Sequence, residues 1–379
     1  MALKRDLAIG IVMGLIVGMA SGYAITAQEI NSLRSQILGC QLRIEELEEI
    51  MPPLRSLAEA RGILIGAAVG YGPLKTEPLY AETLGREFNI LVTENALKFE
   101  PLHPSRDRYN FEDADAIVSF AESNDMKVRG HTLVWHHQLP SWVTTGNFTR
   151  EEWIGILRKH IIAVVKRYRG RVYAWDVVNE AIADDGSLRD TIWLRGIGPE
   201  YIDLAFGWAH EEDPQARLFY NDYGGEGLTQ KSDAIYNLAK GLLERGVPIH
   251  GVGLQMHISL ESSPKPQEVA ANIHRLAELG LEVHITEMDV RIKHPVTEDK
   301  LSAQARVYRE MFEVCLSAEN CKAFVMWGFT DRHSWIPSFF EGYGSALIFD
   351  DSYALKPAYY ALSRFLLNDL IEYRRLENN

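Results

Sequence analysis

Residues 174–180 read AWDVVNE, a short apolar run that ends in an amide and a carboxylate. Seven more β-rich runs occur, at 63–69, 90–95, 127–135, 216–222, 251–257, 282–289 and 323–329. Longer stretches with the apolar spacing of helices lie at 151–168, 199–211, 230–245, 266–279 and 302–317. Strands that alternate with helices indicate parallel βαβ units. Eight such units predict an α/β fold of the closed (β/α)8, or TIM, barrel type.

A doubly wound open sheet is the alternative arrangement of these units, but no Gly-rich phosphate-binding turn follows any of the runs. The composition agrees with a large folded domain, since 46% of the 379 residues are apolar. Three cysteines are too few for a disulfide scaffold. The formal net charge of −13 argues against a nucleic-acid partner, because phosphate binding needs a concentrated Lys/Arg surface.

The N-terminal 28 residues have the pattern of a membrane segment. No charged residue occurs between positions 7 and 28, and Lys4 and Arg5 precede this run. The run is long enough to cross a bilayer, and its basic flank favours a cytoplasmic N-terminus. We predict a cytoplasmic stretch at 1–6 and a transmembrane signal anchor at 7–28, which would hold the rest of the chain outside the cell at its surface. The alternative is a signal peptide cleaved near residues 18–20, followed by secretion.

The next segment, residues 29–55, carries apolar residues at alternating steps of three and four. This a/d pattern of a coiled coil is formed by Ile30, Leu33, Ile37, Cys40, Ile44, Leu47, Met51 and Leu54. We predict a helical stalk that joins two or three copies of the chain as a homo-oligomer and ends at Pro52-Pro53. A single amphipathic helix lying on the barrel is the alternative. The barrel domain is then expected over residues 56–379.

Polar and aromatic residues gather at the carboxyl ends of the β-rich runs, where a barrel of this type holds its active site. They are Glu94, Asn95, His131, Trp135, Asn179, Glu180, Asn221, Asp222, Tyr223, Gln255, His257, Glu287, Asp289 and Trp327. Buried polar groups are costly unless they are paired, so this accumulation indicates one convergent pocket.

Glu180 and Glu287 are the natural reacting pair in such a pocket. Glycoside hydrolysis needs one carboxylic acid to protonate the leaving oxygen and one carboxylate at the anomeric carbon. His257 is expected to keep a carboxylate ionised and oriented. Gln255, two residues earlier in the same predicted strand, should point the same way. Flat apolar faces for sugar rings are offered by Trp135, Trp327 and Trp335.

Several segments resemble, in order and spacing, the motifs of glycoside hydrolase family 10. They are TLVWHHQLPSW (132–142), WDVVNEAI (175–182), FYNDYG (219–224), GLQMH (253–257), ITEMDV (285–290), VMWGFTDRHSW (325–335) and KPAY (356–359). The resemblance spans nearly all of residues 60–367 and implies a retaining endo-β-1,4-xylanase that acts on xylan and xylo-oligosaccharides. It implies Glu180 as the acid/base and Glu287 as the nucleophile. It implies no cofactor, and the absence of an HExxH motif argues against a zinc site.

The resemblance also implies roles for the surrounding residues. Asn95 and Lys98, in ENALKFE, would bind the sugar two places to the non-reducing side of the cut. The sugar that reacts would be surrounded by His131, Trp135, Asn179, Gln255, His257 and Trp327, with Tyr223 as a further substrate contact. Trp335 would crowd out a hydroxymethyl group, which favours xylose over glucose. Asp289 would support the nucleophile indirectly.

Four residues depart from the usual family pattern, namely Ala96, Phe99, His333 and Leu355. They bear on the substrate preference and remove no reacting group. Two other functions stay open at this point, an endo-β-1,4-glucanase-type barrel glycosidase and a non-catalytic surface protein that binds carbohydrate. Cys315 and Cys321 are six residues apart and are expected either to form a small disulfide loop or to be two reduced buried thiols.

Overall fold

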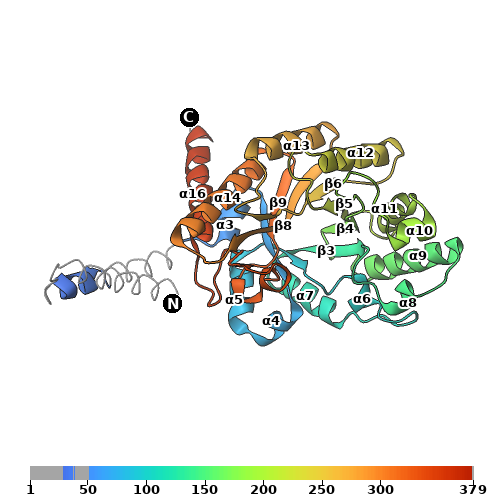
Figure 1. Ribbon diagram of the computed structural model, residues 1–379, viewed down its shortest axis with the longest axis horizontal. Helices are drawn as coiled ribbons and strands as arrows, with labels where there is room; N and C mark the ends of the chain where they lie inside the picture. The colour runs from blue at the N-terminus through green and yellow to red at the C-terminus, as the bar shows by residue number, and fades with distance from the viewer. Residues whose placement is uncertain (1–28, 37, 39–50, 378–379) are drawn as a thin grey trace.

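The computed structural model describes residues 29–36, 38 and 51–377, and most of them form one barrel surrounded by helices (Figure 1). Eight strands make the barrel, namely β1 (Leu64–Val69), β2 (Ile90–Thr93), β3 (Lys127–Val134), β4 (Ala174–Asn179), β5 (Arg217–Asp222), β6 (Gly251–Leu254), β8 (Glu282–Lys293) and β9 (Cys321–Met326). Each strand pairs in parallel with the next, and β9 pairs with β1, which closes the sheet. The predicted (β/α)8 barrel is therefore confirmed, and an open doubly wound sheet is excluded.

Long helices cover the outside of the barrel (Figure 1). They are α5 (Pro78–Glu87), α7 (Glu112–Ser123), α9 (Arg150–Arg167), α11 (Tyr201–Glu212), α12 (Gln230–Glu244), α13 (Pro266–Glu278), α14 (Glu298–Ser317) and α16 (Pro357–Glu377). Shorter helices lie at α4 (Tyr71–Thr76), α6 (Phe99–Leu102), α8 (Ser141–Thr144), α10 (Ile192–Ile197), η1 (Asp331–His333) and α15 (Ile336–Phe339). The strands are buried on both faces, which is why they appear in the sequence as continuous apolar runs rather than as alternating patterns.

The predicted strand 251–257 is interrupted. It ends at Leu254 as β6, and a separate short strand, β7 (His257–Ser259), pairs with the far part of β8. Between them Met256 has φ +67°, a left-handed conformation that breaks a strand, and its N–H donates to Glu226 Oε1 at 3.0 Å. The prediction of one continuous strand over 251–257 was therefore wrong, although the side chains of Gln255 and His257 both reach the same site, as expected.

A short helix, α3 (Leu54–Ala60), precedes β1 and contacts the segments that lead into the amino ends of β2 and β3. Leu54 is fully buried. Its N–H donates to Oε2 of Glu87, the residue that ends α5 shortly before β2, at 3.1 Å. The Arg55 guanidinium donates to the carbonyls of Asn124 and Asp125, at 2.6 and 3.0 Å, just before β3. Leu54 thus belongs to the barrel core and not to a stalk, and the expected domain border at residue 56 falls inside α3.

The described part of the predicted stalk is small. Residues 29–36 are helical, and Leu33 and Leu38 are 40% and 57% exposed. Residues 51–53 are not helical, as the prediction that Pro52-Pro53 ends the helix requires. Within residues 29–36, 38 and 51–377, no helix is both long and apolar enough to span a membrane. The predicted anchor at 7–28 and Cys40 lie outside the described residues.

Cys315, near the end of α14, and Cys321, at the start of β9, form a disulfide. Their Cα atoms are 5.2 Å apart across a separation of six residues. The disulfide ties the helix directly to the strand that follows it, which decides between the two states expected for these cysteines.

Candidate active site

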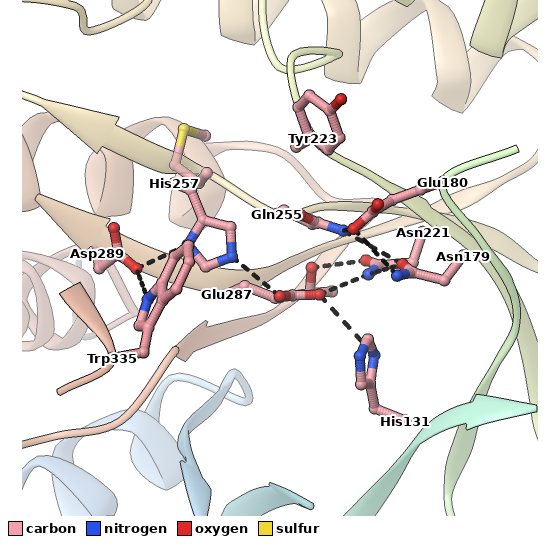
Figure 2. A network of polar contacts seen from close by, with 12 residues as sticks. His131, Asn179, Glu180, Asn221, Tyr223, Gln255, His257, Glu287, Asp289 and Trp335 are labelled. Carbon is pink, nitrogen blue, oxygen red and sulfur yellow. Dashed lines mark hydrogen bonds and ion pairs between the residues drawn. The ribbon is translucent and has the colours of Figure 1, made fainter. Parts of the chain in front are cut away.

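Glu287, on β8, is a buried carboxylate surrounded by donors (Figure 2). Its Oε1 accepts from Asn221 Nδ2 at 2.7 Å, and its Oε2 accepts from His257 Nε2 at 3.0 Å. Burial alone would raise the pKa of Glu287, but the interactions with His131 and His257 outweigh it and lower this pKa. Glu287 is therefore ionised in the free site, as a nucleophile must be.

His257 lies between two carboxylates. Its Nδ1 donates to Asp289 Oδ2 at 2.6 Å while its Nε2 donates to Glu287. Burial by itself would lower the pKa of His257, but the charge and hydrogen bond of Asp289, and then of Glu287, raise it to about 10. The ring is thus an imidazolium and donates in both directions. Trp335 Nε1 also donates to Asp289 Oδ2, at 2.9 Å, so Asp289 orients both rings.

Glu180 follows β4 and has a different setting from Glu287. It is half-buried, and its Oε1 accepts from Asn179 Nδ2 at 3.2 Å and from Gln255 Nε2 at 3.1 Å. The donors that bind its carboxyl group are thus the neutral amides of Asn179 and Gln255. The two carboxylates differ as an acid and a nucleophile should, because one faces charged donors and the other does not.

Three amide side chains connect Glu180 to Glu287. Asn179 Oδ1 accepts from Gln255 Nε2 at 3.2 Å and from Asn221 Nδ2 at 2.8 Å, and Asn221 Nδ2 also reaches Glu287. This arrangement needs a glycine opposite Asn221, since a Cβ on Gly253 would lie 2.1 Å from Asn221 Oδ1. The amide network fixes the relative placement of the two carboxylates.

A buried charge pair supports the site from inside the barrel. Arg129 and Asp176 are fully buried, and the guanidinium binds the carboxylate through both Nε and Nη2. Asp176 Oδ2 also accepts from His131 Nδ1 at 3.0 Å, and this nitrogen is 3.9 Å from Glu287 Oε1. Arg129 further contacts His284 Nδ1 at 2.7 Å. Burial and then the Arg129 charge hold the pKa of His284 well below its usual range, so that ring is neutral and accepts.

Asn95 and Lys98 lie together beside the aromatic wall of the site. Lys98 Nζ donates to Asn95 Oδ1 at 3.0 Å, and it lies 4.9 Å from the ring centroid of Trp135 and 5.7 Å from that of Trp327. Burial lowers the pKa of Lys98. Gln138 Nε2 also donates to Asn95 Oδ1, at 3.2 Å. This cluster offers an amide, a cation and flat ring faces to a sugar.

The predicted site residues therefore come together, with one partial exception. Trp327 packs against His131 at 5.1 Å and Trp335 against His257 at 4.9 Å between ring centroids. Tyr223 lies outside this hydrogen-bonded network and is linked to it through Arg189, which donates to the Tyr223 hydroxyl at 3.0 Å. No group of three or more metal-ligating His, Cys, Asp or Glu side chains occurs in the described part of the chain.

Four residues that shape the site were not identified from the sequence, namely Arg129, Gln138, Asp176 and Arg189. The quoted motifs contain Gln138 and Asp176, so their presence in a motif was an available signal. Arg129 is a charge in the middle of an apolar run, which requires a buried partner. Arg189 lies in a loop and carries no comparable signal.

Two carboxylates in unlike settings, set among amides and indole faces at the carboxyl end of a (β/α)8 barrel, define a glycoside hydrolase. The comparisons with known proteins identify its family. The model of glycosyl hydrolase family 10 matches residues 53–365, so the chain belongs to that family.

The chain is similar to endo-1,4-beta-xylanase B of Thermotoga neapolitana, with 49% identity over 84% of this chain and 93% of that enzyme. Among solved structures, xylanase 10B of Thermotoga petrophila in complex with xylobiose superposes with a TM-score of 0.82 and 48% identity, over 84% of this chain and 98% of that one. An endo-1,4-beta-xylanase of Penicillium canescens has a TM-score of 0.81 at 35% identity, over 83% and 97% of the two chains.

Proposed function

We infer that this chain is an endo-1,4-β-xylanase that hydrolyses internal β-1,4-xylosidic bonds of xylan with net retention. Family membership and the similarity to named xylanases support the activity. The observation that carries the assignment of roles is the contrast between the two carboxylates. Glu287 is held ionised by the His257 imidazolium, whereas Glu180 meets amide donors in a half-buried position.

The reaction then proceeds by double displacement. A carboxylate oxygen of Glu287 attacks the anomeric carbon, the glycosidic C–O bond breaks, and protonated Glu180 gives its proton to the departing oxygen. Ionised Glu180 next takes a proton from a water molecule, which attacks the anomeric carbon and releases Glu287. Retention requires the two carboxyl groups to be roughly 5–5.5 Å apart, and the amide network between them would preserve that spacing throughout.

Substitution of each carboxylate tests these roles. Glu287→Ala should abolish turnover of xylan, while exposed Glu278→Ala serves as a matched control with normal activity. Glu180→Ala should lose xylan hydrolysis but still form the glycosyl-enzyme from a dinitrophenyl xylobioside, whose leaving group needs no proton. Near-normal activity of Glu287→Ala, or an inverted first product seen by proton NMR, would show that the roles are wrong.

Substrate choice separates the remaining alternatives. Release of reducing ends should be fast from xylan and slow from cellulose or mixed-linkage glucan, because Trp335 would crowd out a hydroxymethyl group. Trp335 is fixed for this by its hydrogen bond to Asp289 and its contact with His257. Equal rates on xylan and glucan would favour a glucanase, and binding without release of reducing ends would favour a carbohydrate-binding protein.

We further propose that the enzyme is held at the cell surface by an anchor at 7–28 and a coiled-coil stalk that begins at 29 and ends before α3. The uncharged run and the heptad pattern support this placement. The Cys315–Cys321 disulfide is in keeping with export, since disulfides persist in oxidising compartments. The chain enters the barrel through α3 at the amino ends of the strands, so the cleft at the opposite end would face away from the membrane.

Fractionation of the native protein tests this placement. The enzyme should sediment with membranes, retain its original N-terminus, and cross-link as a dimer or trimer that depends on residues 29–51. Recovery as a soluble secreted protein with a new N-terminus beyond residue 20 would instead support a cleaved signal peptide. A monomer in detergent would count against the stalk.

A further inference from the structure

The backbone of Glu180 has an unusual conformation that needs support. Its φ is +57°, in the left-handed region that favours glycine. Its N–H donates to the Asn221 carbonyl at 2.9 Å, which continues the pairing of β4 with β5. Its own carbonyl accepts from Arg189 Nε at 2.8 Å. A residue in this region persists only where the surrounding contacts hold it, and Arg189 holds the carbonyl side.

Arg189 binds three consecutive carbonyl groups. Besides the Glu180 carbonyl, its Nη2 donates to the Ile182 carbonyl at 3.0 Å, and its backbone N–H donates to the Ala181 carbonyl at 2.7 Å. The segment between them folds back on itself through a bridge between Ile182 and Leu188. This fold-back returns the Arg189 side chain to the strand end that carries Glu180.

The same guanidinium holds Tyr223. Arg189 Nη2 donates to the Tyr223 hydroxyl at 3.0 Å, and Lys231 Nζ lies 3.3 Å from the centroid of the Tyr223 ring. Figure 2 shows Tyr223 on the side of Glu180 that faces away from His131. One side chain therefore fixes both the backbone of Glu180 and an aromatic ring on its outer side.

We propose that Arg189 is a positioning residue that aims the Glu180 carboxyl group at the leaving oxygen and couples it to Tyr223 on the leaving-group side. The inference rests on the proposed role of Glu180 as acid/base. With the peptide groups on both sides of Glu180 fixed, its carboxyl moves only by rotation about side-chain bonds. Without the guanidinium, the carbonyl is free to turn, and Glu180 relaxes toward an ordinary backbone conformation that carries its carboxyl away from the cleaved bond.

The test compares substrates that do and do not need a proton donor. Arg189→Met keeps roughly the length of the side chain and removes every side-chain donor, while the backbone N–H that binds the Ala181 carbonyl remains. We expect kcat/KM for xylotriose to fall roughly 100-fold, the size of effect that misplacing a catalytic group by about 1 Å can produce. For dinitrophenyl xylobioside we expect a fall of less than about threefold, because its leaving group departs without protonation. Arg195→Met, at an exposed arginine of the neighbouring α10, is the matched control and should match the wild type on both substrates.

A second variant guards against a folding defect in the first. Arg189→Lys keeps the charge but can reach fewer of the acceptors, and it should lose roughly 10-fold on xylotriose with little change on the activated substrate. Equal losses on the two substrates in Arg189→Lys, or no loss on xylotriose, would overturn the proposal. If Glu180→Ala itself failed to distinguish the two substrates, the assignment of Glu180 as acid/base would fall instead.

Discussion

Replacing His257 should change how the stability of the enzyme depends on pH. The pKa of His257 rises from 6.5 to about 10 on folding, so the folded protein binds a proton that the unfolded chain releases across this range. A group with a raised pKa contributes stability that is fully present below its unfolded pKa and is lost as pH rises through its folded pKa. A rise of the His257 pKa from 6.5 to about 10 corresponds to a contribution of about 5 kcal/mol to the free energy of unfolding, at 1.36 kcal/mol per pKa unit.

His257→Gln removes this titration and leaves two buried carboxylates without their cation. Asp289 is fully buried and Glu287 nearly so. Breaking a buried ion pair by removing one partner typically costs about 3–5 kcal/mol. The variant should therefore be less stable than the wild type by about that amount at a pH of 6 to 7, and the difference should shrink as pH approaches 10.

Urea unfolding followed by tryptophan fluorescence measures this difference at a series of pH values. Exposed His274→Gln is the control, because it removes a histidine without touching the network. Other groups titrate over the same range, but they do so in both proteins, so the comparison isolates His257. Parallel loss of stability in wild type and His257→Gln between neutral pH and pH 10 would refute the reasoning.

The barrel could be predicted from the sequence because its determinants are local. Each strand is a short apolar run buried on both faces, and the helices between the strands carry their own spacing and caps. The α9 helix, for instance, begins with a capping box formed by Thr149 and Glu152. Glu180 and Glu287 could be identified because the carboxyl ends of parallel strands meet at one end of a barrel, so residues at these strand ends must converge.

The contacts that tune the site could not be predicted in this way, because they depend on long-range geometry. Gln138 and Met256 both have positive φ, which nothing in their residue types indicates. Arg189 reaches Glu180 only because the loop between them folds back. The predicted heptad pattern also extended two positions too far. Met51 is not helical and packs against the barrel core, and Leu54 is fully buried in that core as the first residue of α3.

Two further substitutions probe the cluster beside the aromatic wall and the charge pair inside the barrel. Gln138→Ala removes a donor to Asn95, and the KM for xylotriose should rise roughly 5- to 10-fold with kcat little changed, which is about the value of one hydrogen bond. Equal falls in kcat and kcat/KM would contradict a role in ground-state binding. Asp176→Asn is expected to have a larger effect on folding, because it leaves the fully buried Arg129 guanidinium without a counter-charge. Asp176→Asn should lower the free energy of unfolding by about 3–5 kcal/mol. Asp203→Asn, which breaks a surface ion pair with Arg245, should lower it by no more than about 1 kcal/mol. Urea unfolding at neutral pH compares the two, and similar small losses in both would mean that the buried pair does not stabilise the barrel. Because Asp176 also orients His131 beside Glu287, a folded Asp176→Asn should lose activity even at low temperature, where the protein is fully native.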